Sequence, residues 1–343
     1  MNSAAERWDR IRLWAAAEGI SLAGPAGAGP LESASLRFRD WVARGHHAGL
    51  SWLAAGEESR RDPRVLLPGC QSAAVFGFPY HPDAVAGPAG HIARYAAGLD
   101  YHPVIRAKLG RLLAGLRLAE PGLEGRVAVD TLPILEKPLA ARAGLGWIGK
   151  NTCLIHPQYG SFFCLGVLLL NRPLPPPSSL DGDCGDCRRC LDACPTGAIQ
   201  SPGFLDCRRC LSYLTIEHRG VIPADYRGRL DGNWFGCDRC QSVCPYNRPG
   251  QIRPLPEFAA RPEVAGLTPA ELCGLGSRAF RRRLGQTVLV RATQAGLLRN
   301  MVASGWGRPE MEMPADLIRQ ASARFPLVLD QYQEFYGRGP LRA

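Results

Sequence analysis

Regularly spaced cysteines are the side chains of this sequence best suited to chemistry. The chain contains 13 cysteines, and the stretch from Cys184 to Pro195 has the pattern C-x2-C-x2-C-x3-C-P. Bacterial ferredoxins bind [4Fe–4S] clusters with this pattern, in which three thiolates hold one cluster and the fourth cysteine ligates another. Zinc sites more often use two CxxC pairs or mixed Cys and His ligands. The spacing therefore predicts iron–sulfur chemistry.

A second cysteine run supplies most of another ligand set. Residues 237–245 read C-x2-C-x3-C-P, the same pattern without its first cysteine. The missing ligand must come from upstream, where Cys207 and Cys210 are both candidates that the spacing does not separate. The crossed arrangement predicts one cluster on Cys184, Cys187, Cys190 and Cys244, and the other on Cys194, Cys237, Cys240 and either Cys207 or Cys210.

A glycine-rich stretch precedes the cysteines. Residues 127–151 read VAVDTLPILEKPLAARAGLGWIGKN, which predicts a strand ending at Asp130, a helix over 133–143 and a loop rich in glycine. Such a loop lets the backbone approach a flat ligand closely, and a carboxylate at a strand end is well placed for proton transfer. The residues alone favour a plainer role for Asp130, as the N-cap of the following helix. A second cluster of polar and aromatic side chains lies at 94–102. Its plainer interpretation is a solvated turn with ordinary aromatic packing.

The first half of the chain must position these groups with a mixture of helices and strands. Hydrophobic periodicity predicts helices over 4–19, 35–43 and 104–116, and strands over 72–78, 127–130 and 162–170. The segment 162–170 is apolar on both faces, as expected of a central strand. The proline-rich segment 171–180 then marks a boundary.

Cysteine dominates residues 181–250, and helical patterns return afterwards. They cover 269–275, 278–284, 290–304 and 315–323. We therefore expect three units: an α/β (α+β) domain over 1–175, a ferredoxin-like module with two [4Fe–4S] clusters over 176–250, and a small helical, HEAT-like region over 251–343.

Composition narrows the class of protein. The chain has 343 residues and a net charge of +10. The basic excess lies outside the cysteine region, with 19 basic and 14 acidic residues in 1–175 and 13 against 8 in 251–343. Nucleic acid is thus a partner to test, although an arginine-rich coding bias explains the charge equally well. A charged N-terminus and a longest apolar run of nine residues favour a cytoplasmic protein without a membrane span.

Taken together, these motifs resemble the epoxyqueuosine reductases. The resemblance covers roughly residues 1–305 and rests on RRDP at 60–63, GLDYH at 98–102, VDT at 129–131, the ARAGLGWIGKN loop, both cysteine runs and CRRCLSYLTIEHRG at 207–220. It implies reduction of epoxyqueuosine to queuosine at the wobble position of tRNA, the last step of queuosine biosynthesis. The implied cofactors are cobalamin, bound to the N-terminal domain, and two [4Fe–4S] clusters. A monomer and an external low-potential electron donor, flavodoxin or ferredoxin, are also implied.

The resemblance assigns roles to single residues. It makes Asp130 the catalytic acid, and burial beside an apolar corrin face would raise its pKa and keep it protonated. It makes Cys210 the cluster ligand in place of Cys207. The expected cobalamin contacts are Arg60, Ala93, Asp130, Lys150, Asn151, Leu154, Leu165, Ser212, Asp238 and Arg239. The expected contacts to the tRNA anticodon stem-loop are Arg219, Arg227 and Arg229, with Arg281–Arg283 as a more distant patch.

Two other functions share part of this pattern. One is a corrinoid iron–sulfur reductase acting on a small molecule, as reductive dehalogenases do, but those are commonly exported with a Tat signal. The other is a ferredoxin-type electron carrier, which would not need the long segments on either side of the cysteine region. Cobalamin content after anaerobic purification separates a carrier from both enzymes.

Overall fold

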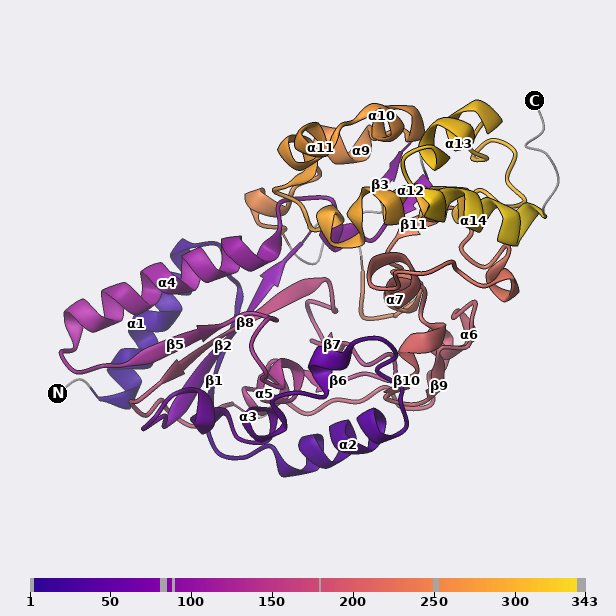
Figure 1. Ribbon diagram of the computed structural model, residues 1–343. Coiled ribbons are helices and arrows are strands. Elements are labelled where there is room, and N and C mark those ends of the chain that lie inside the picture. Colours follow the sequence, from indigo (N-terminus) through magenta and orange to yellow (C-terminus); the bar gives the residue numbers. More distant parts are fainter. Residues whose placement is uncertain (1–2, 81–84, 88–89, 179, 249–252, 338–343) are drawn as a thin grey trace.

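An antiparallel sheet in the order β1-β2-β8-β5 organises the N-terminal part of the computed structural model (Figure 1). The structure describes residues 3–80, 85–87, 90–178, 180–248 and 253–337. The strands are β1 (Leu22–Gly27), β2 (Ser72–Pro79), β8 (Phe163–Leu170) and β5 (Gly125–Ala128). Strand β8 pairs with β2 along its whole length and with β5 on its other side. It is therefore the central strand that its apolar faces predicted.

Helices cover both faces of this sheet. On one face, α1 (Ala4–Ala17) and α4 (Tyr101–Ala119) share a core with β2 and β8. Gly166 of β8 allows this close packing, because a Cβ there would lie 2.6 Å from Ile105 Cγ2 on α4. The other face packs against α5 (Glu136–Arg142), and α2 (Glu32–Ala43) and α3 (Glu57–Arg61) follow β1 in the chain. The predicted mixed α/β character is thus confirmed.

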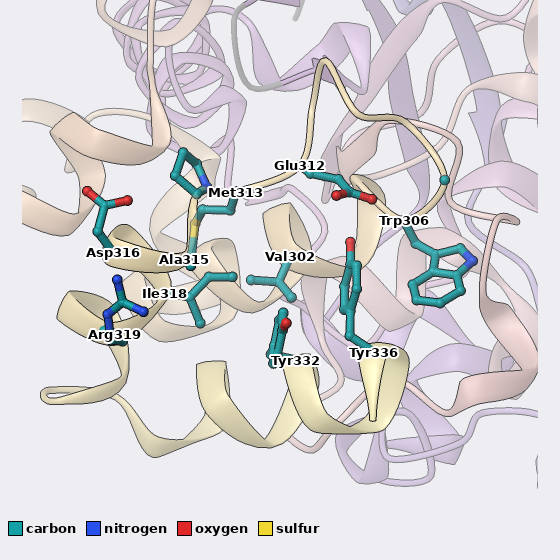
Figure 2. Close-up of a pocket in the computed structure, with 12 residues that line it drawn as sticks. Val302, Trp306, Glu312, Met313, Ala315, Asp316, Ile318, Arg319, Tyr332 and Tyr336 are labelled. Carbon is teal, nitrogen blue, oxygen red and sulfur yellow. The ribbon is translucent and has the colours of Figure 1, made fainter. Parts of the chain in front are cut away.

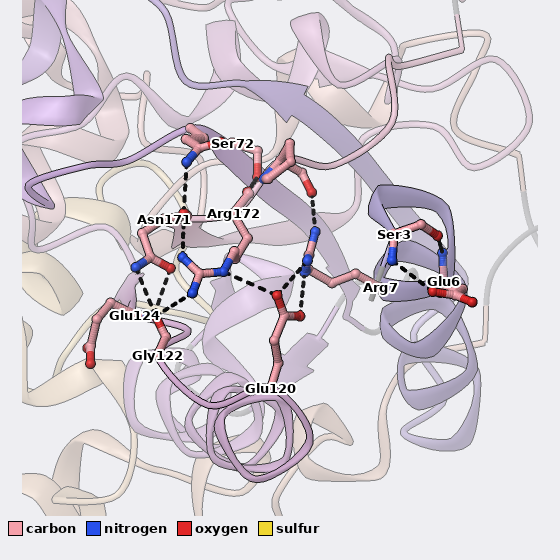
Figure 3. A network of polar contacts seen from close by, with 11 residues as sticks. Ser3, Glu6, Arg7, Ser72, Glu120, Gly122, Glu124, Asn171 and Arg172 are labelled. Carbon is pink, nitrogen blue, oxygen red and sulfur yellow. Dashed lines mark hydrogen bonds and ion pairs between the residues drawn. The ribbon is translucent and has the colours of Figure 1, made fainter. Parts of the chain in front are cut away.

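A buried ion pair ties α1 to the end of α4 (Figure 3). The Arg7 side chain is 3% exposed, and its Nε and Nη2 donate to the two Glu120 carboxylate oxygens at 2.8 and 2.6 Å. Arg172 donates to the same carboxylate from Nε at 3.2 Å. The carboxylate is therefore held by two guanidinium groups from distant segments of the chain.

We expect Arg7→Ala to lower the free energy of unfolding by about 3 kcal/mol, because it leaves the buried Glu120 charge with one partner fewer. Urea unfolding followed by circular dichroism measures this loss. Arg12→Ala is the matched control: its partner is Asp9, both side chains are more than half exposed, and such pairs contribute less than about 1 kcal/mol. Equal losses in the two variants would contradict a structural role for the buried pair.

The cysteine region consists of short elements. Helices α6 (Arg189–Asp192) and α8 (Arg239–Ser242) each begin within a cysteine run. Between them lie the hairpin β9 (Ile199–Ser201) and β10 (Phe204–Leu205), and then α7 (Leu211–Ile216). Strand β11 (Asn233–Phe235) pairs in parallel with β4 (Gly90–Ile92), which pairs with β3 (Val85–Gly87). Through this small sheet, a segment of the N-terminal half joins the cysteine region.

The C-terminal part is helical and packs around α12 (Thr293–Ser304). The other helices are α9 (Pro262–Ala265), α10 (Pro269–Gly274), α11 (Ser277–Leu284), α13 (Ala315–Ser322) and α14 (Pro326–Tyr336). Buried Asn300 of α12 donates to the carbonyls of Thr215 and Trp234 at 2.6 and 2.9 Å, which anchors these helices on the cysteine region. Within the described residues, every helix is too short or too polar to cross a membrane.

Candidate active site

An open cavity of about 210 Å³ lies where the sheet meets the cysteine region. The sheet side contributes Phe163, Cys164 and Leu165 of β8, and Leu154 of β7 (Leu154–Ile155). The cysteine side contributes Gln241, which follows Cys240 on α8. The remaining lining residues are Tyr80, Tyr101, Asp130, Glu136, Lys137, Cys153 and Ser161. The cavity thus combines an apolar floor with a cluster of titratable groups.

The backbone of Asp130 is held in an uncommon conformation. Its φ angle is +50°, in the left-handed region that Asp tolerates better than most residues. The Asp130 N–H donates to Glu136 Oε1 at 2.7 Å, so this bond fixes the loop between β5 and α5. Helix α5 begins at Glu136 and its N-cap Leu135 makes no side-chain capping bond. The simpler interpretation of Asp130 as the N-cap is therefore wrong.

The Asp130 carboxylate receives two hydrogen bonds from the start of α4. Tyr101 Oη and His102 Nε2 both lie 3.0 Å from Asp130 Oδ2, and His102 Nδ1 lies 2.7 Å from Asp100 Oδ1. His102 thus bridges two carboxylates, an arrangement that favours a proton on each ring nitrogen. The solvated turn expected at 94–102 is instead part of the site.

This bridge decides where the proton resides. Burial alone would lower the pKa of His102, but its hydrogen bonds to Asp100 and Asp130 raise it to about 9. Burial would raise the pKa of Asp130, yet the hydrogen bond and charge of His102 and the bond from Tyr101 lower it below its ordinary value. The contacts within the chain therefore favour an ionised Asp130 carboxyl and a protonated imidazole near neutral pH. The rise in the pKa of Asp130 expected beside an apolar corrin face stays a prediction.

Glu136 is a second proton carrier in the same cavity. Burial, reinforced by the neighbouring Asp130 charge, raises the pKa of Glu136 to about 8. The group is therefore largely protonated near neutral pH, although its Oε1 still accepts the Asp130 N–H bond. Sequence reasoning missed Glu136, because a carboxylate in the first turn of a helix ordinarily serves the helix dipole.

The first predicted cluster set comes together in the structure. Four cysteines line one cavity: Cys184, Cys187, Cys190 and Cys244. The loop after β6 (Trp147–Ile148) braces this site, since Lys150 Nζ donates to the Cys187 carbonyl at 3.0 Å. Asn151 Nδ2 donates to the Cys240 carbonyl at 3.3 Å. Lys150 and Asn151 thus support the cysteine loops and lie outside the lining of the Asp130 cavity.

The second set converges around Cys210. Electrostatic interactions connect its thiol with Cys194, Cys237 and Cys240. The interactions of Cys207 are with Cys210, Asp206 and Lys137. This geometry favours Cys210 as the fourth ligand.

We expect Cys210→Ser to reduce the iron content of the anaerobically purified protein by roughly half, since one of two four-iron clusters loses a ligand. Cys207→Ser is the matched control, three residues away on the same turn, and should keep its full iron content. Iron and sulfide analysis with EPR of the reduced protein measures both variants. The reverse pattern, with iron lost from Cys207→Ser, would transfer the ligand assignment to Cys207.

The other predicted cofactor residues lie around the cavity without lining it. Arg60 is buried with its guanidinium 5.2 Å from the Phe38 ring centroid, and its charge faces Asp130. Ala93 is buried against Gly236, where a Cβ would lie 2.5 Å from its own. The remaining three residues all have partners within the chain. Asp238 accepts the Arg94 N–H at 2.6 Å, Arg239 pairs with Asp231, and Ser212 contacts the Cys210 thiol.

The three arginines expected to contact tRNA are exposed but also make intramolecular bonds. Arg219 donates to the carbonyls of Ile216 and Arg291 at 3.1 and 2.9 Å. Arg227 lies over the Trp306 ring at 5.3 Å, and Arg229 donates to the Pro195 carbonyl at 2.9 Å. Arg281–Arg283 lie on α11. Of these groups, Arg219 is connected through Arg291 to the surroundings of Asp130.

A cavity larger than the Asp130 cavity lies elsewhere. It has a volume of about 970 Å³ and lies among the C-terminal helices, with Trp306, Tyr332 and Tyr336 in its lining (Figure 2). None of the residues that line it was predicted to act on a substrate or to hold a cofactor. Volume alone therefore does not identify the reaction centre, which is located by the titratable groups beside the cysteines.

Comparison with known proteins agrees with this geometry. Residues 183–247 match the family model "4Fe-4S double cluster binding domain". Residues 60–131, which include Arg60, His102 and Asp130, match "Epoxyqueuosine reductase QueG, DUF1730". The chain therefore contains a double-cluster iron–sulfur domain that holds both cysteine runs.

Full-length similarity extends these matches. The epoxyqueuosine reductase of Xanthomonas campestris pv. campestris is 40% identical over 307 residues, covering 87% of this chain and 86% of that protein. The Pseudomonas aeruginosa enzyme is 39% identical over 295 residues, covering 83% and 81%. The solved structure of the Streptococcus thermophilus epoxyqueuosine reductase has a TM-score of 0.81 at 28% identity, covering 98% and 95%.

A further solved structure contains an epoxyqueuosine reductase with a tRNA-Tyr epoxyqueuosine-modified tRNA stem loop. It matches with a TM-score of 0.77 at 26% identity and covers 96% of this chain and 98% of that one. Similarity of this extent, together with the Asp130 cavity and the paired cysteine sets, shows that the chain belongs to the epoxyqueuosine reductase family.

Proposed function

We propose that this protein reduces epoxyqueuosine to queuosine at the wobble position of tRNA, as the final step of queuosine biosynthesis. The observation that carries the proposal is one cavity lined both by Asp130, whose carboxylate is bonded to His102, and by Gln241 of the cysteine-bearing helix α8. The residues that would supply protons and the cysteines that would hold the electron-carrying clusters thus meet at this cavity. Its organisation would be a cobalamin-binding domain over 1–175, a two-cluster module over 176–250 and a HEAT-like helical region over 251–343, acting as a cytoplasmic monomer.

Cobalamin fits the chemistry of this cavity. The apolar side chains of Leu154, Phe163 and Leu165 in its lining suit an apolar macrocycle face, and Gln241 in the same lining belongs to the cysteine region. When bound, cobalamin would supply low-potential reducing equivalents to the epoxide carbon. The residues that would hold it are Arg60, Ala93, Lys150, Asn151, Leu154, Leu165, Ser212, Asp238 and Arg239.

The two cysteine sets differ in their position relative to the Asp130 cavity, which gives the electron path a direction. Gly185, Asp186 and Arg188 are exposed beside the ligands of the first set, so an external donor such as flavodoxin or ferredoxin would dock there. Cys240 of the second set precedes Gln241, which lines the Asp130 cavity. Bound clusters would supply single electrons along this order.

The proton comes from the residues of the cavity. Opening of the epoxide places negative charge on oxygen, and the reduction consumes two electrons and two protons as that oxygen leaves as water. His102 passes a proton through the Asp130 carboxylate to this oxygen, and Tyr101 holds the carboxylate in place. Glu136, protonated near neutral pH, is our candidate for the second proton.

Direct turnover tests the proposal. The anaerobically purified protein, supplied with cobalamin and a low-potential reductant, should convert an epoxyqueuosine-containing anticodon stem-loop into the queuosine form. Nucleoside mass spectrometry after digestion measures the conversion, and tRNA from a deletion strain should accumulate epoxyqueuosine. A protein with both clusters and cobalamin that leaves the stem-loop unchanged would refute the activity.

A further inference from the structure

Three segments distant in sequence meet beside the reaction centre. They are the turn Ser51–Leu53, the residues that follow α7, and the turn Val288–Ala292. Arg291 joins them: its guanidinium carbon lies 5.8 Å from the Trp52 ring centroid, and its Nε donates to Glu217 Oε1 at 2.7 Å. Its carbonyl accepts a bond from Arg219 Nη2 at 2.9 Å. Trp52, Arg219, Glu217 and Arg291 therefore form one connected surface group, which we call the lip.

This lip lies near the active-site cavity without lining it. The Arg291 charge interacts with Asp130 and with the Tyr101 hydroxyl. Because both groups line the cavity, a nucleotide whose modified base reaches Asp130 must bring its neighbours and their phosphates toward Arg291. The lip thus lies where the nucleotides next to the modified base would pass.

The ring of Trp52 is available to a ligand. Trp52 is 47% exposed, and the other large hydrophobic side chains with comparable exposure among the described residues are aliphatic: Leu13, Leu36, Val65 and Leu118. Unpaired bases stack on exposed aromatic rings, and nearby arginines hold the backbone of the same strand. An exposed aromatic ring under a guanidinium group is therefore well suited to unpaired RNA.

The charges of the lip favour an anionic partner. Arg291 is partly neutralised by Glu217, whereas the two bonds that Arg219 makes are to backbone carbonyls, which leave its positive charge uncompensated. Exposed Arg219 thus retains both its charge and unused N–H donors, and phosphate oxygens accept bonds from such donors. An acidic protein surface would use the charge as well but would not require the Trp52 ring.

We propose that an unpaired nucleotide adjacent to epoxyqueuosine stacks on Trp52, while Arg219 and Arg291 bind its phosphates. This inference rests on the proposed function, since the anticodon loop supplies the nucleotide. It extends the site from the single modified base to its neighbour, and it gives a role to a side chain that no cluster or cofactor requires. Trp52 is a binding residue here and takes no part in bond breaking.

The test measures binding of a synthetic anticodon stem-loop by fluorescence anisotropy. Trp52→Ala should weaken binding roughly tenfold, in line with the loss of one base–aromatic stack, whereas Trp52→Phe should stay within about threefold of wild type. Leu118→Ala, which removes an 87% exposed side chain of α4, is the matched control and should bind normally. Arg219→Gln should reduce the slope of log affinity against log salt by roughly 0.7–0.9.

A second readout distinguishes stacking from general damage. With 2-aminopurine placed on either side of the wobble nucleotide, one of the two positions should be quenched by wild type and by Trp52→Phe but not by Trp52→Ala. In turnover, Trp52→Ala should raise KM for the stem-loop in preference to lowering kcat. Affinity equal to that of Leu118→Ala, or a loss confined to kcat, would overturn the inference.

The two proposals can fail separately. A wild-type protein that binds the stem-loop but forms no queuosine counts against the activity and leaves the Trp52 comparison interpretable. Conversely, normal queuosine formation with unchanged Trp52→Ala affinity counts against the stacking platform alone. If Trp52→Ala impairs binding of flavodoxin or ferredoxin and not of RNA, the lip is a protein interface and the RNA assignment is wrong.

Discussion

Asp130→Asn is expected to lower the rate of epoxide reduction by about 10²- to 10⁴-fold, the usual contribution of a positioned proton donor. Asparagine has nearly the same shape and can still accept the hydrogen bonds of Tyr101 and His102 at one oxygen. It cannot take up the His102 proton and pass it on. The developing negative charge on the epoxide oxygen would then lack its proton source.

Single-turnover kinetics with the modified stem-loop measure this effect, with iron and cobalamin content determined on the same preparation. The matched control is Asp9→Asn, the same chemical change at an exposed position on α1, which should leave turnover unchanged. Asp130→Asn should keep its clusters, because Asp130 is not among the cysteine loops. Turnover within a few-fold of wild type would remove Asp130 from the mechanism.

Spacing along the chain was sufficient to group the cysteines of the first set. The crossed pattern of the cysteine runs places Cys244 with Cys184, Cys187 and Cys190, and these four line one cavity. The apolar pattern of 162–170 likewise predicted the central strand β8. Both signals are strong because ligand spacing and two-faced burial are imposed locally on consecutive residues.

Other features depend on contacts between distant segments. The pKa of Asp130 follows from His102, which lies 28 positions earlier and reaches the carboxylate from the first turn of α4. Burial alone would raise the pKa of Asp130, but within the chain the hydrogen bonds and the charge of His102 outweigh desolvation and lower it. The choice between Cys207 and Cys210 also depends on where Cys194 and Cys237 lie in space.

Secondary structure was missed where tertiary pairing overrides composition. Strand β1 contains Gly24, Pro25 and Gly27, which read as a loop, yet it pairs with β2 in continuous antiparallel register. The proline is tolerated because β1 is an edge strand. The parallel pairing of β4 with β11 joins residues about 140 positions apart, and periodicity within a short window cannot detect such a contact.

The second large effect should come from His102. We expect His102→Gln to reduce turnover about 100-fold at neutral pH, because it removes the proton held near Asp130. In wild type the imidazole is protonated below its raised pKa of about 9, so the rate should fall as pH rises through that value. The charged and titratable groups that interact with His102 and Asp130 include Arg60, Asp100, Tyr101, Arg106, Glu136 and Arg291.

The variant should also shift the pH profile in a specific direction. Without the His102 charge, the pKa of Asp130 rises, and Asp130 can act as an acid only when it is itself protonated. Activity of His102→Gln should therefore increase toward acidic pH, where wild type is flat, and be lost as pH rises through the carboxyl pKa. Glu136→Gln removes the neighbouring group with a pKa of about 8, so an alkaline limb that persists in this control belongs to His102. An unchanged profile in His102→Gln would mean that the proton reaches the epoxide oxygen by another route.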